Sequence, residues 1–173
     1  MAPKSNGNGN GTDGNEHICE CKVSGEFTCA DETCLNRISL IECDPKLCLG
    51  MDKCKNQRFR KCEYAKCKPF KTKSAGWGLM ALEDIKKGHF VIEYMGEIID
   101  EEECDRRLKK IASTQSNFYF LNLDKDLFID AGPKGNMARF MNHSCEPNCV
   151  TQKWVVGNHT RIGLFALHDI PAG

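Results

Sequence analysis

Residues 139–149 read Arg-Phe-Met-Asn-His-Ser-Cys-Glu-Pro-Asn-Cys, and this stretch carries more information than any other part of the chain. Two apolar residues are followed directly by an amide, an imidazole, a hydroxyl and a thiol. A helix packed in a core would not place four polar side chains in a row, because each buried polar group needs its own hydrogen-bond partner. Pro147 favours a turn over a continuing helix. The stretch therefore predicts a functional site on an irregular segment.

Length and composition bound the type of protein around this stretch. The chain has 173 residues, of which 28% are charged and 40% hydrophobic, and its formal net charge is zero. These values are typical of one globular domain, or of one domain with a small satellite. No apolar run reaches the roughly 18 residues of a membrane helix, so no membrane partner is expected. Residues 1–17 are rich in Gly and Asn and lack the apolar run of a secretory signal, which predicts a flexible tail.

Cysteine is concentrated in the first part of the chain. Nine of the twelve cysteines come before residue 68, and only three follow. A segment with so few other core-forming residues needs metal or disulfide staples. Disulfides require an oxidising compartment, for which the sequence carries no signal, so clustered thiols favour zinc.

The number of closely spaced cysteines does not fit two independent zinc sites. The first seven follow the pattern C-x-C-x7-C-x4-C-x8-C-x4-C-x5-C, whereas two separate four-cysteine sites need eight ligands. Either one thiolate bridges both ions, or an eighth ligand comes from Cys62, Cys67 or His17. A site made only of thiolates has no open position for water, so the predicted zinc is structural.

Charge is distributed unevenly along the chain. Residues 53–73 hold nine basic residues and one acid, and residues 83–105 hold nine acids and two lysines. The basic stretch has the composition of a nucleic-acid contact, and the acidic stretch that of a contact for a basic partner. The plainer interpretation is that both are solvated faces.

Residues 90–167 predict short strands with one clear helix. Residues 90–99 are β-branched and aromatic and predict a strand. Asp100 is a plausible N-cap for the helix that follows, with Cys104 on its apolar face and therefore in the core. Residues 118–123 and 127–130 predict a hairpin, as do residues 150–156 and 160–167.

The pattern Ala-Leu-x-Asp-Ile-x-x-Gly occurs twice, at residues 81–88 and 166–173. The first copy leads directly into the strand predicted at Phe90. By analogy, a further strand is expected to follow the second copy, after Gly173.

Several motifs together resemble the SET-domain protein lysine methyltransferases. The motifs are Gly76-Trp77-Gly78, Glu93-Tyr94-Met95-Gly96-Glu97, Arg139 to Cys145, and Gly163-Leu164-Phe165-Ala166. The cysteine spacing before them resembles the AWS (associated-with-SET) zinc module, and this combination is typical of enzymes that methylate lysine 36 of histone H3. Taken singly, Trp77, Tyr94 and His143 are more typical of structural residues, so it is their combination that points to a site.

The resemblance implies a fold and a division of the chain. The expected fold is mainly β with few helices, a SET domain of short sheets preceded by a small, irregular, zinc-stapled module. The expected division is a tail at 1–17, an AWS module at 18–68 and a SET domain at 69–173 that is incomplete at its C-terminal end.

The resemblance also implies ligands and the residues that contact them. Tyr94 and Phe118 match the lysine channel, and S-adenosylmethionine is expected as the cofactor. Its expected contacts are Gly76, Trp77, Gly78, Ser116, Asn117, Phe118, Tyr119, Arg139, Asn142 and His143. One zinc is expected on Cys19, Cys21, Cys29 and Cys34, and a second on Cys29, Cys43, Cys48 and Cys54, with Cys29 bridging. Cys62 and Cys67 are then free thiols.

The family pattern continues past the last residue of this chain. A channel-closing tyrosine and three further cysteines, which would join Cys145 around a third zinc, are expected after Gly173. We therefore expect residues 1–173 alone to have little methyltransferase activity. The alternative is a catalytically inactive, zinc-containing chromatin-binding form.

The expected partners and location follow from the same resemblance. The histone H3 tail is the expected substrate, and nucleosomal DNA is expected to contact the basic stretch at 53–73. The expected location is the nucleus, on chromosomes, and the expected state is a monomer.

Overall fold

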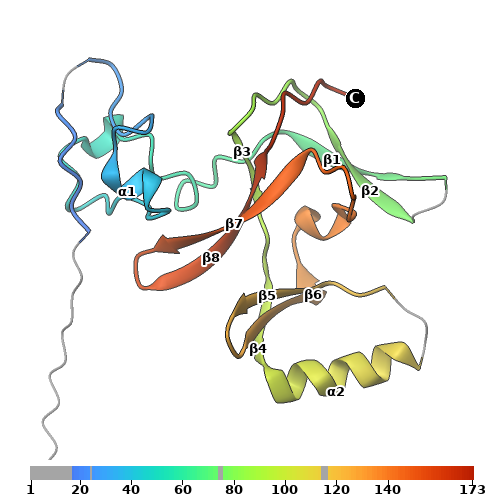
Figure 1. Cartoon of the computed structure of the whole chain (residues 1–173). Helices are drawn as coiled ribbons and strands as arrows, with labels where there is room; N and C mark the ends of the chain where they lie inside the picture. Colours follow the sequence, from blue (N-terminus) through green and yellow to red (C-terminus); the bar gives the residue numbers. More distant parts are fainter. Residues whose placement is uncertain (1–16, 24, 74–75, 114–116) are drawn as a thin grey trace, which may run out of the picture.

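The computed structural model describes residues 17–23, 25–73, 76–113 and 117–173. The predicted tail, except for His17, and the predicted cofactor contact Ser116 lie outside these ranges. Figure 1 shows a small cysteine-rich lobe beside a larger body of three short sheets. The mainly β fold expected from the sequence is confirmed.

The cysteine-rich lobe has little regular structure. Among its described residues, the helices and strands are limited to the helical turns α1 (Leu35–Ile38) and η1 (Met51–Lys53). Its buried core consists of six thiols, those of Cys19, Cys29, Cys34, Cys43, Cys48 and Cys54. A lobe of this kind has almost no aliphatic core of its own, as the sequence indicated.

The larger body contains eight strands in three sheets. The antiparallel pair β1 (Cys67–Lys71) and β2 (Trp77–Ala81) forms one sheet. The second sheet has the order β3 (Phe90–Glu93), β8 (His159–Ala166), β7 (Cys149–Val156). The third has the order β4 (Gly96–Asp100), β6 (Leu127–Gly135), β5 (Phe120–Asp124). Both predicted hairpins are thereby confirmed.

The prediction of one continuous strand over residues 90–99 is wrong. The chain leaves the second sheet after Glu93, which pairs with Gly163, and enters the third sheet at Gly96. A Cβ atom at Gly96 would lie 2.5 Å from the Asp130 carbonyl oxygen, so a glycine is needed where the chain changes sheets. The run of β-branched and aromatic residues cannot reveal this crossing, because it continues through both strands.

The helix α2 (Glu101–Ala112) begins where the sequence predicts. The Asp100 side chain accepts a hydrogen bond from the Glu103 amide at 2.8 Å, which is the expected N-cap. Cys104 is buried against the sheet, as predicted. Arg107 binds Asp130 at 2.6 Å and Glu97 at 2.8 Å, and so fixes the helix to β6 and β4.

The repeated eight-residue pattern forms a structural feature that we call the clasp, residues 81–88 and 166–173. The copies run antiparallel, and Ile85 and Ile170 exchange two backbone hydrogen bonds of 2.8 Å. The amide of Gly88 donates to the Ala166 carbonyl at 2.7 Å, and the amide of Gly173 donates to the Ala81 carbonyl at 2.8 Å. Likewise, Asp84 accepts a hydrogen bond from the Ala172 amide at 2.8 Å, and Asp169 accepts one from the Lys87 amide at 2.9 Å. The clasp is therefore two-fold symmetric in its hydrogen bonds.

The two lobes share a core. Phe59, from the cysteine-rich lobe, is 1% exposed and packs with Phe90, Trp154, Val156 and Phe165 of the larger body. The backbone also crosses the junction, since Val155 donates to the Leu40 carbonyl at 2.9 Å. No helix within the described ranges is long and apolar enough to cross a membrane.

Candidate functional site

A cavity of about 570 Å³ lies beside the polar stretch at 139–149. The segment 118–121, the turn η2 (Met137–Phe140), the loop 141–148 and the start of β7 surround it. The predicted site residues that line it are Tyr94, Phe118, Tyr119, Arg139, Asn142 and His143. Residues that are far apart in the sequence thus meet at one site.

Aromatic side chains form one wall of the cavity. The Tyr94 hydroxyl donates to the Tyr119 carbonyl at 2.9 Å, which fixes the backbone of the segment that carries Phe118. Burial raises the pKa of Tyr94 to about 12, so its hydroxyl keeps its proton at neutral pH. Phe118 is 59% exposed, an unusual exposure for a phenylalanine, and it borders the cavity opening.

Arg139 is held by contacts on two sides. Its guanidinium lies over the Tyr119 ring, 4.1 Å from the centroid, and donates to the Gly132 carbonyl at 2.8 Å. Its Nε atom is buried without a hydrogen-bond partner among the described residues. A buried donor without a partner is costly, so this atom indicates a polar ligand at the cavity.

The predicted glycine loop lies next to the cavity but does not line it. Asn142 donates from Nδ2 to the Trp77 carbonyl at 3.0 Å, which ties the loop to the polar stretch. Gly76 has a φ of +71°, in the left-handed region that favours glycine. Trp77 is 52% exposed, so it is not the core residue that the plainer interpretation suggested. Asn117 also lies outside the lining and donates to the Tyr119 hydroxyl at 3.5 Å.

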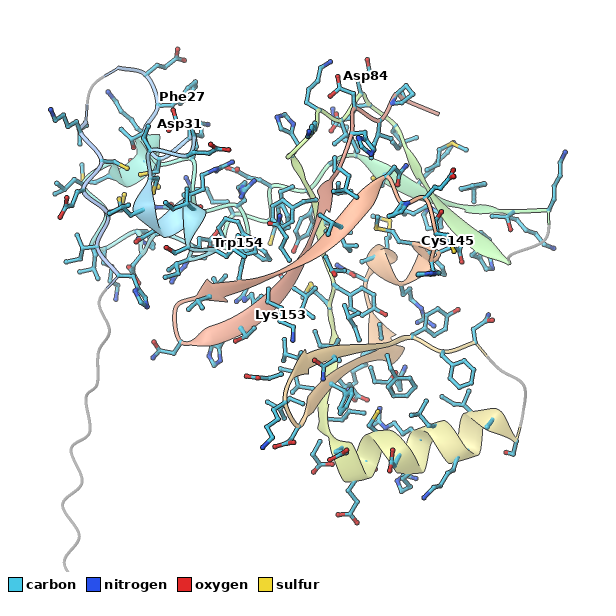
Figure 2. The ribbon with its side chains drawn as sticks, viewed as in Figure 1. Phe27, Asp31, Asp84, Cys145, Lys153 and Trp154 are labelled. Atoms are coloured by element: carbon cyan, nitrogen blue, oxygen red, sulfur yellow. The ribbon has the colours of Figure 1, made fainter. Side chains whose placement is uncertain are left out.

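Cys145 lies apart from the other predicted zinc ligands. It is exposed on the loop between η2 and β7, on the opposite side of the molecule from the cysteine-rich lobe (Figure 2). No group of metal-binding side chains within the described part of the chain includes it.

The seven spaced cysteines converge inside the small lobe. Six of their thiols, all except that of Cys21, form two overlapping groups, Cys19, Cys29, Cys34 and Cys43, and Cys29, Cys43, Cys48 and Cys54. Neighbouring sulfur atoms lie 3.6 to 3.9 Å apart. Zinc with Zn–S bonds of about 2.3 Å holds its four thiolates about 3.8 Å apart, so the donor set fits zinc.

The second group matches the predicted second zinc site, and the first differs from the prediction at one ligand. Cys43 stands where the resemblance implied Cys21. The Cys21 thiol nevertheless lies near enough to the thiols of Cys29 and Cys34 for them to influence its pKa. Two four-coordinate ions that share only Cys29 need seven thiols, and Cys21 is the seventh, so Cys21 stays the proposed ligand.

Metal-free thiols in this lobe are electrostatically strained. Burial raises the pKa of the Cys29 thiol well above its usual value, and the neighbouring thiols raise it further. Asn56 donates to the Cys43 sulfur from Nδ2 at 3.3 Å and to the Cys54 sulfur from its backbone amide at 3.4 Å. Such N–H donors stabilise thiolates around a metal ion.

The basic stretch at 53–73 does not form one solvated face. Arg60 pairs with Asp44 at 3.5 Å, and Lys66 pairs with Glu83 at 3.5 Å. The Arg58 guanidinium turns inward onto aromatic rings. In the sequence Arg58 is one of several basic residues. The one feature that sets it apart from them is its position next to Phe59.

The fold and the two sites define a class of protein, a module built around a thiol cluster that fits zinc, joined to a β-rich domain with a ligand-sized cavity. The SET domain family model matches residues 76–173, and the AWS domain model matches residues 25–62. The chain therefore belongs to the SET domain family and carries an AWS domain.

Curated relatives agree with this assignment. Over 157 residues the chain is 55% identical to the human protein named histone-lysine N-methyltransferase, H3 lysine-36 specific, covering 90% of this chain and 6% of that protein. It is 55% identical to mouse histone-lysine N-methyltransferase NSD3, with 90% and 11% covered. It is 46% identical to Arabidopsis thaliana histone-lysine N-methyltransferase ASHH1, with 88% and 32% covered. The chain thus spans less than a third of the length of each of these relatives.

Solved structures with the same fold include Chaetomium thermophilum Polycomb Repressive Complex 2. One of them, in an autoinhibited conformation bound to S-adenosylmethionine, matches with a TM-score of 0.80 and 29% identity. The match covers 90% of this chain and 22% of that chain.

Proposed function

We propose that this chain is the catalytic part of an S-adenosylmethionine-dependent protein-lysine methyltransferase that acts on histone H3, at lysine 36, in nucleosomes. The observation that carries the proposal is the single cavity at which Tyr94, Phe118, Arg139 and Asn142 meet. Relatives at 55% identity that bear the name H3 lysine-36 specific support the choice of substrate. Nuclear, chromosomal location and a monomeric state belong to the same proposal.

The cofactor has a site whose chemistry suits it. When bound, S-adenosylmethionine supplies an electrophilic methyl group. Asn142 and His143 present polar groups at the cavity, and the unpartnered Nε of Arg139 is a donor suited to an anionic or carbonyl oxygen. Asn142 also holds the Trp77 carbonyl, so the glycine loop is fixed at the edge of the same site.

The aromatic wall prepares the substrate lysine for attack. A lysine reacts only as the neutral amine, and an aromatic, partly dry channel lowers the pKa of its ammonium group by desolvation. Tyr94 and Phe118 supply that environment, and the aromatic faces still attract a cationic methylated product. Because Tyr94 fixes the Tyr119 backbone, the wall is preorganised, and alignment of the reacting atoms is the main contribution that a methyl transfer needs.

The remaining ligands and partners have separate parts in the proposal. Zinc on Cys19, Cys21, Cys29 and Cys34, and on Cys29, Cys43, Cys48 and Cys54, stabilises the small lobe and takes no part in the chemistry. Acidic residues at 83–105 attract the basic histone tail. Unpaired basic residues at 53–73, such as Lys61, contact DNA phosphates.

Cofactor binding is the first test of the proposal. Calorimetric titration of S-adenosylmethionine should show binding that Asn142→Ala weakens by about tenfold or more, because one anchoring hydrogen bond and the position of the glycine loop are lost together. Asn158→Ala, on the exposed turn between β7 and β8, is the matched amide control and should bind like the unmodified chain. Equal affinity of the Asn142→Ala variant would contradict the assigned site.

Methyl transfer is the second test. Labelled methyl transfer to nucleosomes is measured for the chain alone and for the chain extended with the segment that follows the matched region in the human relative. The extended chain should label nucleosomes, and replacing lysine 36 of histone H3 with alanine should abolish the label. Transfer that persists on the substituted nucleosomes would refute the choice of lysine but not the enzyme class.

A further inference from the structure

A second cavity, of about 830 Å³, lies between the two lobes and plays no part in the proposed methyl transfer. Residues 30–33, Arg37 and Arg58 line it from the cysteine-rich lobe, and Lys87, His89 and Trp154 line it from the larger body. Figure 2 shows Trp154 on the part of the body that faces the small lobe, with Asp31 on the lobe itself. We call this feature the junction cavity.

Arg58 lies in the junction cavity in an unusual environment. Its guanidinium carbon is 5.0 Å from the centroid of Phe165 and 5.1 Å from that of Trp154. Within the described ranges, the guanidinium makes no hydrogen bond and no ion pair, and Glu42 and Glu63 influence it only through space. Five N–H donors are thus held in one orientation by aromatic stacking and have no acceptor.

Two more cations face the same cavity. Arg37 makes one long hydrogen bond, of 3.5 Å, to the Lys55 carbonyl. Lys87 is exposed and lines the cavity, and its backbone amide donates to Asp169 at 2.9 Å. Burial, and then the charge of Arg37, lower the pKa of Arg58 to about 10, so the two guanidinium groups lie near each other, while the charges of Glu42 and Glu63 act on Arg58 in the opposite direction.

The acidic residues of the cavity offset this group only in part, because the charge of Asp31 interacts with that of Arg37 and not with that of Arg58. Asp31 accepts hydrogen bonds from the Thr33 amide at 3.0 Å and the Thr33 hydroxyl at 2.6 Å, which turn its carboxylate into the loop. Glu32 is exposed at the rim. A planar guanidinium with free donors beside two further cations is the donor set that binds phosphate.

We propose that the junction cavity binds a phosphate group of nucleosomal DNA, with Arg58 as the central donor and Arg37 and Lys87 beside it. The inference rests on the proposed function for its choice of ligand. Arg58 belongs to the basic stretch 53–73, so the site continues the surface expected to contact DNA, whereas Arg37 and Lys87 lie outside that stretch. A phosphate here contacts both lobes at once, and therefore also holds them in one relative position.

The test measures binding of the whole chain to a labelled DNA duplex by fluorescence anisotropy at several salt concentrations. Arg58→Met keeps the apolar stack and removes the charge, and Lys87→Ala removes a rim cation without touching the core. Arg58→Met should lower affinity about tenfold or more, as for loss of a hydrogen bond to a charged group. Each variant should reduce the slope of log K against log salt by about 0.9, the value for one phosphate contact.

Three controls separate the possible outcomes. Lys125→Ala, on the exposed turn between β5 and β6, measures the effect of losing a charge remote from the cavity, and an equal change of slope there would overturn the site. The proposed site would also be overturned if Arg58→Met, with a normal zinc content, bound DNA as tightly as the unmodified chain. If Arg58→Met still binds DNA but no longer binds a poly-glutamate peptide, the cavity would be assigned to an acidic protein instead of phosphate. Failure of the proposed enzyme function would appear separately, as absent methyl transfer with the slope change intact.

Discussion

The cysteine-rich lobe and the larger body are built around cores of different chemistry. In the lobe, six buried thiols take the place of a hydrophobic core. In the body, aliphatic and aromatic side chains form three clusters, around Val91, Phe90 and Ile129. A thiol cluster is stable only with a metal ion, whereas apolar clusters are stable in water by themselves. The difference teaches that one chain can contain two units with separate requirements for folding, joined here at Phe59.

Removal of metal should have the largest effect and should separate the two units. Structural zinc contributes on the order of 10–16 kcal/mol of apparent binding free energy in small zinc modules. A chelator should therefore abolish hydrogen-exchange protection in residues 28–56 and leave the hairpin of β5 and β6 protected. Cys62→Ser, at an exposed cysteine predicted to be free, should retain the full zinc content. Protection of residues 28–56 that survives complete metal removal would show that thiol packing alone suffices.

The identity of the first zinc site can be resolved by counting ions. If Cys21 is a ligand, Cys21→Ser should lower the zinc content from two ions per chain to one, because a three-thiolate site binds zinc weakly. Cys104→Ser, at a buried cysteine in α2, is the control and should keep both ions. Atomic emission on dialysed protein gives the count. If Cys21→Ser still binds two zinc ions, the fourth ligand of the first site is Cys43 and not Cys21.

Phe59 tests whether the two cores are independent. Truncation of a buried phenylalanine to alanine costs about 3–5 kcal/mol, and Phe59 is 1% exposed among residues of the body. Phe59→Ala should therefore destabilise β3, β7 and β8 although it belongs to the cysteine-rich lobe. Urea denaturation followed by Trp154 fluorescence measures the loss, and Phe27→Ala, at a half-exposed phenylalanine, should change little. A small effect of Phe59→Ala would mean that the lobe is only loosely attached.

Local sequence signals predicted the local structure well. Asp100 marks the start of α2, and the turn residues mark both hairpins, because caps and turns depend on neighbouring residues alone. The spacing of seven cysteines predicted the thiol cluster for a similar reason, since metal ligands must come in a fixed number. The motif around Asn142 indicated a site because its polar residues had no place in a core.

Long-range features were not visible in the sequence. The crossing between sheets at Gly96 depends on the Asp130 backbone, which is distant along the chain, and the apolar pattern runs through it unchanged. The repeat at 81–88 and 166–173 is visible in the sequence, but the pairing of its two copies is not. In the sequence Arg58 is one of several residues in a charged stretch, yet aromatic residues from β3, β7 and β8 turn it inward. In each case the deciding partner lies far away along the chain.

The clasp should show the smallest effect, one that depends on pH. Hydrogen bonds from the Lys87 amide and the Lys86 ammonium hold the pKa of Asp169 below its usual value. A carboxylate whose pKa is lowered by folding stabilises the fold above its unfolded pKa, and this contribution is lost as pH falls through the folded pKa. Asp169→Asn keeps an oxygen for the Lys87 amide and removes only the charge. The variant should therefore be slightly less stable than the unmodified chain at neutral pH and equally stable at pH values below the lowered pKa of Asp169.

The quantity to measure is the difference in the free energy of unfolding between the unmodified chain and Asp169→Asn. Acid also protonates the zinc thiolates, but the stability lost in that way is the same in both proteins. Urea denaturation at a series of pH values gives the difference, and amide exchange at Ile85 and Ile170 shows whether it arises in the clasp. Lys86→Met removes the ammonium group that lies 2.9 Å from the Asp169 carboxylate. In that background, the pH at which the stability difference disappears should move toward the usual aspartate pKa. A difference that stays constant with pH would mean that backbone hydrogen bonds alone hold the two copies of the repeat together. The clasp would then resemble the apolar core of the larger body, whose stability does not depend on charge, and not the cysteine-rich lobe.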